Sequence, residues 1–456
     1  MMRKANRMEE IDAAVNKFEP VTPDHEFYVN FENLRGNFQE RRVMRILNAI
    51  PKNGSYHFDY QPNKYNKTLL FLAGMRGSGK TSELAKYYQL LDSPDCFFVV
   101  TCNVDTDLDL NNMQYMDILI FQLEKLLQKA KAHDLNLDKS IIDSLEIWFQ
   151  ERVEEINKGL KTEGSAELEI GNDDAFSITG LLGKLIGITV KLKTGLSGSY
   201  ERAEAIRTNI KNRFPDFAVK FNTFIEQTNQ QLRKEHKGQE VLFIVDGLEK
   251  TMTAETRRKI IMEESNRIRQ IRVNTIFTLP IELIKEKQLM QSFSETVTFP
   301  FIKIVERDGS TVQKAIERFE EFVCKRVDKS LFDSVETIHL AIQYSGGSPR
   351  QLLRIIEQAT WRADETVGKI TRADMEQAID REGNSIARFI EPADFEALKS
   401  LKGELDAGVP IGFDTASIQG LLEREIIFEY NDTTYKRVNP LLERSKLYRY
   451  RVLGQI

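Results

Sequence analysis

The sequence contains few of the residues that build disulfide frameworks, metal centres or membrane spans. Its 456 residues include three cysteines and five histidines, and no grouping of them has metal-site spacing. Cys96, Cys102 and Cys324 are therefore expected to be free thiols in a reducing compartment. No stretch reaches the roughly 18–20 apolar residues of a membrane span, and the basic N-terminus lacks the apolar core of a secretory signal. We therefore expect a cytoplasmic protein with no membrane partner.

The composition is that of an ordinary globular protein with a weakly acidic balance. Apolar residues make up 41% and charged residues 29%, with a formal net charge of −5. The length fits two to four domains. The acidic balance argues against a surface that coats nucleic acid as a whole, and it leaves room for one local basic patch.

Apolar runs alternate with helical patterns over the first two thirds of the chain. This alternation predicts an α/β fold, a three-layer core around a doubly wound parallel sheet. Strands are expected at 68–73, 96–101, 241–245, 274–278 and 296–304, and helices at 80–91, 115–131, 139–157 and 201–235. Residues 158–200 read as an insertion, with exposed strands at 166–170 and 188–192.

The flanking regions predict further units. Residues 1–66 form a polar N-terminal segment that precedes the core of 67–304 and holds one helix, from about Leu34 to Ile50. Four helical patterns, at 311–327, 331–344, 348–362 and 371–380, predict a small helical domain over 305–390. Two helices and a hairpin of 426–430 and 434–438 predict a winged helix over 391–456.

One short segment carries the most specific signal. Gly74-Met75-Arg76-Gly77-Ser78-Gly79-Lys80-Thr81 matches G-x-x-x-x-G-K-[ST] between a predicted strand and a predicted helix. Its backbone N–H groups, and the start of the helix that continues with Ser82, would cradle phosphates. Lys80 would reach the β- and γ-phosphates, and the Thr81 hydroxyl would bind Mg²⁺. The segment predicts a site for ATP, or a close purine relative, with Mg²⁺.

An acid at the end of a second buried strand would complete the metal site. Asp246 follows the apolar run of 241–245, where a carboxylate can hold the Mg²⁺ of a P-loop. The alternative is that Asp246 caps a helix. Further on, Gly346 and Gly347 permit a tight turn and Pro349 suits the first turn of a helix that carries Arg350.

The order of these features resembles STAND-type and origin-recognition-like AAA+ ATPases over about residues 25–455. The resemblance implies that Glu249 orients the attacking water, displaced from the position that Gly247 occupies here. It implies a γ-phosphate sensor at Thr278 and a lid sensor at Arg350, beside Pro349. It further implies that Phe27–Val29 and Arg35–Gly36 flank adenine. A solvated acid, a strand-end threonine and a helix-start arginine are the alternative readings.

The resemblance also implies a function. ATP would drive a slow switch that controls homo-oligomeric assembly or a co-encoded effector, and the P-loop sequence is similar to that of ATPases in bacterial antiphage systems. Two other readings stay open: a DNA-handling AAA+ protein that binds through its winged helix, and a module that holds ATP without turnover. The tail with Arg444, Lys446, Arg449 and Arg451 among tyrosines suits either DNA or an intramolecular clamp.

Two weaker patterns complete the sequence. Arg257, Arg258, Arg267 and Arg269 are candidates for an arginine finger or a solvated basic face. The run from Asp105 to Asn111 resembles a calcium loop, but Leu110 stands where glycine is needed and Met116 where glutamate is needed. We expect a plain polar loop there.

Overall fold

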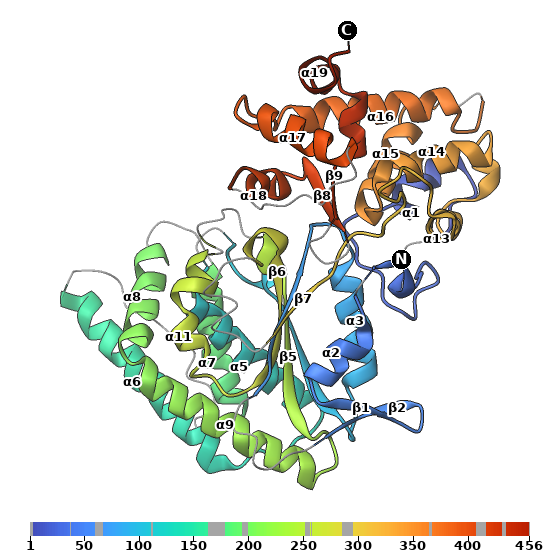
Figure 1. The fold of residues 1–456 in the computed structure, drawn as a ribbon. Helices are drawn as coiled ribbons and strands as arrows, with labels where there is room; N and C mark the ends of the chain where they lie inside the picture. Colours follow the sequence, from blue (N-terminus) through green and yellow to red (C-terminus); the bar gives the residue numbers. More distant parts are fainter. Residues whose placement is uncertain are drawn as a thin grey trace.

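A five-stranded parallel sheet forms the centre of the protein (Figure 1). The computed structural model describes residues 3–36, 38–59, 67–110, 113–162, 178–193, 199–250, 256, 258–284, 295–363, 367–406, 416–430 and 435–455. The strands lie in the order β4-β5-β6-β3-β7. Their bounds are β3 Leu69–Gly74, β4 Phe97–Asn103, β5 Glu240–Asp246, β6 Asn274–Pro280 and β7 Glu295–Thr298. The predicted α/β class with a parallel sheet is confirmed.

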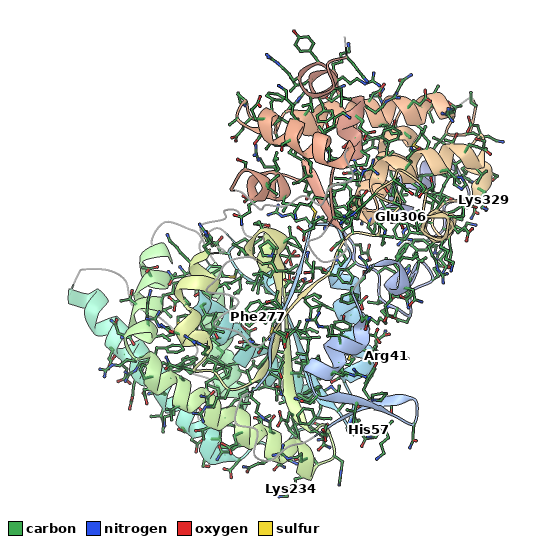
Figure 2. The ribbon with its side chains drawn as sticks, viewed as in Figure 1. Arg41, His57, Lys234, Phe277, Glu306 and Lys329 are labelled. Atoms are coloured by element: carbon green, nitrogen blue, oxygen red, sulfur yellow. The ribbon has the colours of Figure 1, made fainter. Side chains whose placement is uncertain are left out.

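Alternating side chains on the strands enter two separate cores, as the strand period of two requires. Phe71 and Phe243 face one cluster, whereas Leu70 and Leu72 face the other. The first cluster is covered by the long helices on the left of Figure 1, the second by α2 and α3 on the right. Phe277 lies between these layers, and Lys234 projects at the periphery (Figure 2).

The helices that cover the sheet follow the expected order. Their bounds are α2 Glu40–Ile46, α3 Lys80–Leu91, α4 Val104–Asp107, α5 Tyr115–Ala132, α6 Lys139–Thr162, α7 Ile178–Lys193, α8 Ser199–Asn212, α9 Phe214–Lys234 and α11 Ser265–Ile268. A two-stranded antiparallel hairpin, β1 Ala49–Lys52 and β2 Ser55–Phe58, extends from α2. No helix among the described residues is long and apolar enough to cross a bilayer.

Three local predictions were wrong, one of them only in extent: the strand expected over 296–304 is β7, which ends at Thr298. The helix expected over Leu34–Ile50 is only α2, because Asn48 takes a left-handed φ of +57° and the chain then enters β1. Residues 188–192 are not a strand but part of α7, whose Leu181, Leu185 and Ile188 are buried at helical spacing. The other expected strand, 166–170, lies outside the described residues.

The region after the sheet is helical, as expected from its periodicity. Its helices are α13 Gln313–Cys324, α14 Val335–Ser345, α15 Pro349–Thr360 and α16 Arg372–Ala387. We call these four helices the lid. The N-terminal residues Ala5, Ile11 and Ala14, the last two in α1 (Ile11–Ala14), share its hydrophobic cluster. By contrast Phe38 and Val43 pack with the sheet. The N-terminal segment therefore contributes side chains both to the hydrophobic cluster of the lid and to that of the sheet.

The C-terminal elements follow the order expected for a winged helix. Helices α17 Asp394–Asp406 and α18 Ala416–Glu423 precede strands β8 Ile427–Tyr430 and β9 Tyr435–Val438. The two strands pair antiparallel, with Glu429 opposite Lys436. A short helix α19, Lys446–Tyr448, and a helical turn η8, Arg449–Leu453, lie at the end of the molecule farthest from the sheet (Figure 1).

Candidate nucleotide site

The P-loop joins β3 to α3 through backbone conformations that only glycine adopts easily. Gly77 and Gly79 have φ values of +75° and +95°. Gly74 has no room for a side chain, since a Cβ would lie 2.6 Å from the carbonyl oxygen of Phe299. Helix α3 then begins at Lys80, so its first backbone N–H groups face the loop. The segment has the local geometry of a phosphate cradle.

Lys80 is buried, with its ammonium surrounded by oxygen atoms. Nζ donates to the carbonyl oxygens of Gly74 and Met75, both at 3.0 Å, and lies 3.4 Å from Oε1 of Glu249. A buried cation needs such acceptors, because without them its desolvation would be uncompensated. The contacts hold the ammonium at the loop, where a phosphate would meet it.

Thr81 and Asp246 stand side by side, as a shared metal ion requires. Thr81 Oγ1 donates to Asp246 Oδ2 at 2.6 Å. Burial, and next the negative charge of Glu249, raise the pKa of Asp246 above its ordinary value. A divalent cation would relieve this repulsion, and a hydroxyl with a carboxylate suits Mg²⁺. The residues therefore fit the metal, with phosphate oxygens and water as its remaining ligands.

Glu249 faces Lys80 from the short helical turn η3, Leu248–Lys250. Burial alone would raise the pKa of Glu249, but Lys80 and a hydrogen bond from Thr278 hold it below its ordinary value. Its Oε2 is buried and accepts no hydrogen bond from a described residue. Glu249 is thus an ionised carboxylate with one oxygen available to orient a water molecule.

Gly247 and Thr278 shape the turn that places the two acids. Gly247 has a φ of +99°, and a Cβ there would lie 3.2 Å from the backbone nitrogen of Asp105. A glutamate at position 247 would therefore be strained, which gives a reason for the displacement to 249. The Gly247 N–H donates to Thr278 Oγ1 at 3.0 Å. Thr278 is fully buried and supports the turn from behind, without lining the cavity.

The lid reaches the P-loop at the start of α15. Pro349 is the first residue of that helix, and Ser348 caps it. A Cβ placed on Gly77 would lie 2.7 Å from Cβ of Arg350, so the arginine packs directly on the loop. Arg350 lines the cavity and makes no hydrogen bond or ion pair with any residue that the structure describes. This arrangement leaves a guanidinium available to an anionic ligand.

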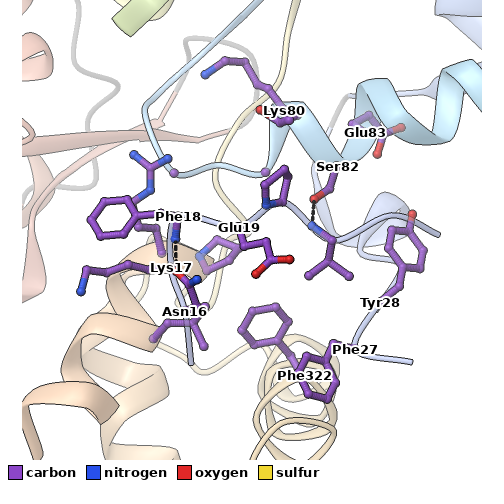
Figure 3. A pocket seen from close by; sticks show the side chains of 18 of the residues that line it. Asn16, Lys17, Phe18, Glu19, Phe27, Tyr28, Lys80, Ser82, Glu83 and Phe322 are labelled. Carbon is purple, nitrogen blue, oxygen red and sulfur yellow. Dashed lines mark hydrogen bonds between the residues drawn. The ribbon is translucent and has the colours of Figure 1, made fainter. Parts of the chain in front are cut away.

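Between the core, the lid and the N-terminal segment lies a cavity of about 280 Å³ (Figure 3). We call Asn16–Val29 the strap, because it runs along this cavity. The Val21 N–H donates to Ser82 Oγ on α3 at 3.3 Å. The carbonyl of Phe27 accepts from Arg326 in the lid at 3.0 Å. The cavity is thus bounded by three parts of the chain that are distant in sequence.

Phe27, Tyr28 and Val29 all line the cavity. Their expected contact with adenine stays a prediction. Arg35 also borders the cavity but supports the P-loop: its guanidinium donates to Ser78 O at 2.8 Å and Pro300 O at 2.7 Å. Burial lowers the pKa of Arg35 to about 10. Gly36 has a left-handed φ of +61° and is not a lining residue.

Several lining residues were missed by the sequence analysis. Asn103 ends β4 opposite Asp246, and Asp105 forms an ion pair with Lys250. Asp105 belongs to the run set aside as a false calcium loop, and no described group of three or more acids, histidines or cysteines could hold a metal there. Its position after a parallel strand could have revealed it, since the carboxyl ends of parallel strands meet at one edge. Nothing in the sequence marks Arg326 or the part of the strap before Phe27.

Part of the P-loop faces away from the cavity. The side chain of Met75 is 2% exposed and packs with Ile281, Phe301 and the core of the winged helix. Arg76 is exposed and donates to the carbonyl of Glu249 at 2.9 Å. Ser78 is buried, and its Oγ has no partner among the described residues. Of the arginine-finger candidates, Arg257 lies outside the described residues, and Arg258, Arg267 and Arg269 do not line the cavity.

Comparison with known proteins finds only distant likenesses. No protein-family model matches the chain, and no curated protein matches it. Among solved structures it is similar to the Orc1 protein of Aeropyrum pernix in complex with DNA, at 11% identity and a TM-score of 0.33, covering 95% of this chain and 96% of that one. Cdc6p from Pyrobaculum aerophilum gives 10% identity and a TM-score of 0.33, covering 96% and 99%. Likeness this weak assigns no function, which must come from the cavity.

Proposed function

We propose that this protein is an ATP-binding and slowly ATP-hydrolysing molecular switch that controls its own assembly or an associated effector. Lys80 and Arg350 would bind the phosphates, and Thr81 and Asp246 would hold Mg²⁺, which neutralises phosphate charge when bound. Glu249 would orient water through Oε2, the oxygen that does not face Lys80, and turnover would be slow because Gly247 stands where a fast enzyme would have glutamate. The form of the P-loop supports a setting in antiphage defence.

One observation carries the proposal: the cavity at the P-loop is lined by three parts of the chain that are distant in sequence, the core, the lid and the strap. The core contributes Lys80 and Glu249, the lid contributes Arg350, and the strap contributes Phe27. A ligand that contacts all three favours the arrangement in which they meet, by its differential affinity for that arrangement. Occupancy of the site would therefore set the position of the lid.

Met75 offers a route from the same loop to the winged helix. Its side chain is buried in the cluster that contains Leu422, Ile427 and Phe428. Phe428 in turn packs against Gly346, where a Cβ would lie 2.7 Å from its ring, at the turn before Pro349. The P-loop, the lid turn and the winged helix therefore share one packed unit, so a shift in one is felt by the others.

The test compares the assembly state of the full chain with Mg²⁺ and either ADP or a non-hydrolysable ATP analogue, alone and with any co-encoded partner. A switch predicts different masses by light scattering for the two nucleotides. Lys80→Ala should remove the difference because it abolishes binding, whereas Lys131→Ala, an exposed lysine on α5, should keep it. Identical masses for the wild type in every state would sink the proposal.

Met75→Ala separates coupling from binding. Truncation of a buried methionine costs about 2–5 kcal/mol, and here the loss falls on the interface with the winged helix. We expect nucleotide binding to survive, because the Met75 backbone still accepts from Lys80. The assembly response to ATP should weaken, and hydrogen exchange in α18 and β8 should rise. A variant that still switches like the wild type would show that the winged helix is not coupled through this residue.

A second function, DNA binding through the C-terminal end, is favoured by one surface feature. Arg449, Tyr450 and Arg451 are exposed on η8, with Tyr450 62% exposed. Arg444 is different, because it donates to Asp380 at 2.6 Å. A salt-sensitive affinity for duplex DNA that is lost in Arg449→Ala/Arg451→Ala, and kept in Arg444→Ala, would support this function. Equal affinity in all three proteins would exclude it.

A further inference from the structure

Arg326, which follows α13, is a buried cation at the wall of the nucleotide cavity. It is 4% exposed and yet lines the cavity. Its Nη1 donates to Phe27 O at 3.0 Å and to Phe322 O at 2.9 Å. The guanidinium lies 3.8 Å from the centroid of the Phe322 ring and 5.1 Å from that of Phe27. The residue therefore stands among aromatic rings, tied to the strap by one of its nitrogens.

No carboxylate in the described part of the chain pairs with Arg326, and burial lowers its pKa to about 9. Its Nε and Nη2 groups donate to no described residue. A guanidinium can only donate, so these N–H groups require an acceptor. They are not among the buried atoms without a partner, so they are open to the cavity that Arg326 lines. A ligand in the cavity with an acceptor at this end would meet the requirement.

The surroundings of Arg326 are suited to a base. Figure 3 shows Phe27 and Phe322 together, across the cavity from Lys80, so the phosphate end and the aromatic end are separate. Aromatic side chains stack on bases without regard to sequence, and discrimination requires hydrogen bonds to the base edge. The exocyclic amine of adenine is a donor and cannot pair with Arg326, which leaves the ring nitrogens N1, N3 and N7.

We propose that Arg326 recognises the bound purine by donating a hydrogen bond to one of its ring nitrogens. The proposal rests on the proposed ATP site and goes further, because it makes Arg326 a specificity-determining residue. Its role in holding the strap is a separate one. Loss of the strap contact would weaken the binding of all nucleotides by the same factor. Loss of base recognition would instead remove the difference in affinity between nucleotides that differ by one ring nitrogen.

The experiment is a double-mutant cycle by calorimetry on the full chain with Mg²⁺. ATP and its 1-deaza, 3-deaza and 7-deaza analogues are titrated into the wild type and Arg326→Met, a variant whose side chain has no hydrogen-bond donor. A hydrogen bond to a charged donor is worth about tenfold or more in affinity. We expect one analogue to bind the wild type about tenfold more weakly than ATP, and to bind Arg326→Met with the same affinity as ATP binds that variant.

Lys325→Ala is the matched control. Lys325 also ties the strap to the lid, through Tyr28 O at 2.7 Å, but does not line the cavity. The Lys325→Ala variant should distinguish ATP from the deaza analogue by the same factor as the wild type does. Equal binding of ATP and all three analogues by the wild type would overturn the proposal, and this result needs no variant. Discrimination that persists in Arg326→Met would overturn it too. If the wild type binds no nucleotide, the proposed function itself fails.

Discussion

The two sides of the nucleotide cavity are built differently. On the core side the functional groups already contact one another: Lys80 contacts Glu249, and Thr81 donates to Asp246. On the lid side Arg350 and Arg326 make no ion pair with a described residue, and the charge of Arg350 only partly offsets the rise that burial causes in the pKa of the nearby Glu425. The core side is therefore pre-organised without a ligand, while the two arginines of the lid side make no ion pair.

This difference assigns the two sides different tasks. Pre-organised groups need no rearrangement when charge develops, which suits the chemical step. Unpaired cations gain most from an anionic ligand, which suits a lid that responds to occupancy. Catalysis should thus depend mainly on the core side, and nucleotide affinity and lid position mainly on the lid side. Three substitutions separate these effects.

The largest effect is expected for Glu249→Gln on the core side. Removal of the carboxylate that orients water should lower phosphate release about 100-fold or more, while ATP affinity stays within a few-fold. Glu240→Gln is the control, because Glu240 is a buried acid at the start of β5, the strand that leads to the turn of Glu249, and pairs with Lys67. A Glu249→Gln variant that hydrolyses ATP at the rate of the wild type would remove Glu249 from the reaction.

The contrast between the two sides also separates what the sequence could predict from what it could not. The core side comes from contiguous patterns: the P-loop of Gly74–Thr81, and an acid after a buried strand at Asp246. In a parallel sheet the strand ends converge, so a motif on one strand implies neighbours on the next. The succession of strands and helices along the chain followed from the same periodicity, but the order of the strands within the sheet was not predicted.

The lid side depends on contacts between distant segments. Arg326 reaches Phe27 across nearly three hundred residues, and no local pattern encodes such a contact. At residues 188–192 a local pattern was misleading. Its alternation of apolar and polar residues predicted a strand, but these residues belong to α7, which buries one of its faces. Met75 was assigned to the nucleotide because it lies within a motif, yet its side chain packs on the winged helix.

Arg350→Ala tests the lid side, with a smaller expected effect. Loss of one charged donor to phosphate should weaken ATP binding about tenfold. The stability of the ligand-free protein should change little, since Arg350 makes no hydrogen bond or ion pair with a described residue and only partly offsets the raised pKa of the nearby Glu425. Arg354→Ala, one turn later, should do the reverse: Arg354 pairs with the buried Glu382 at 2.6 Å, and it does not line the cavity. Titration calorimetry and thermal unfolding of both variants give the two readouts.

The smallest effect concerns the cost of holding two acids on the core side. The pKa of Asp246 is raised in the folded protein, so its ionised form costs stability at neutral pH, and this cost fades as pH falls below that raised pKa. Asp246→Asn should therefore stabilise the ligand-free, metal-free protein at pH 7 by about 1 kcal/mol, with a gain that shrinks as pH falls through the raised pKa. The amide can still accept from Gly247 and donate to Thr81 Oγ1, so no hydrogen bond need be lost.

Asp328→Asn is the control with the opposite sign. The Ser330 backbone N–H and then Lys4 lower the pKa of Asp328, so its charge contributes stability above the ordinary aspartate pKa, and this contribution is lost as pH falls through the lowered value. Neutralising it should lower the melting temperature at pH 7, while neutralising Asp246 should raise it. If both variants melt below the wild type at pH 7, the repulsion between Asp246 and Glu249 does not lower the stability of the folded protein. The contrast between the core side and the lid side would then rest only on Arg350 and Arg326, which make no ion pair with a described residue.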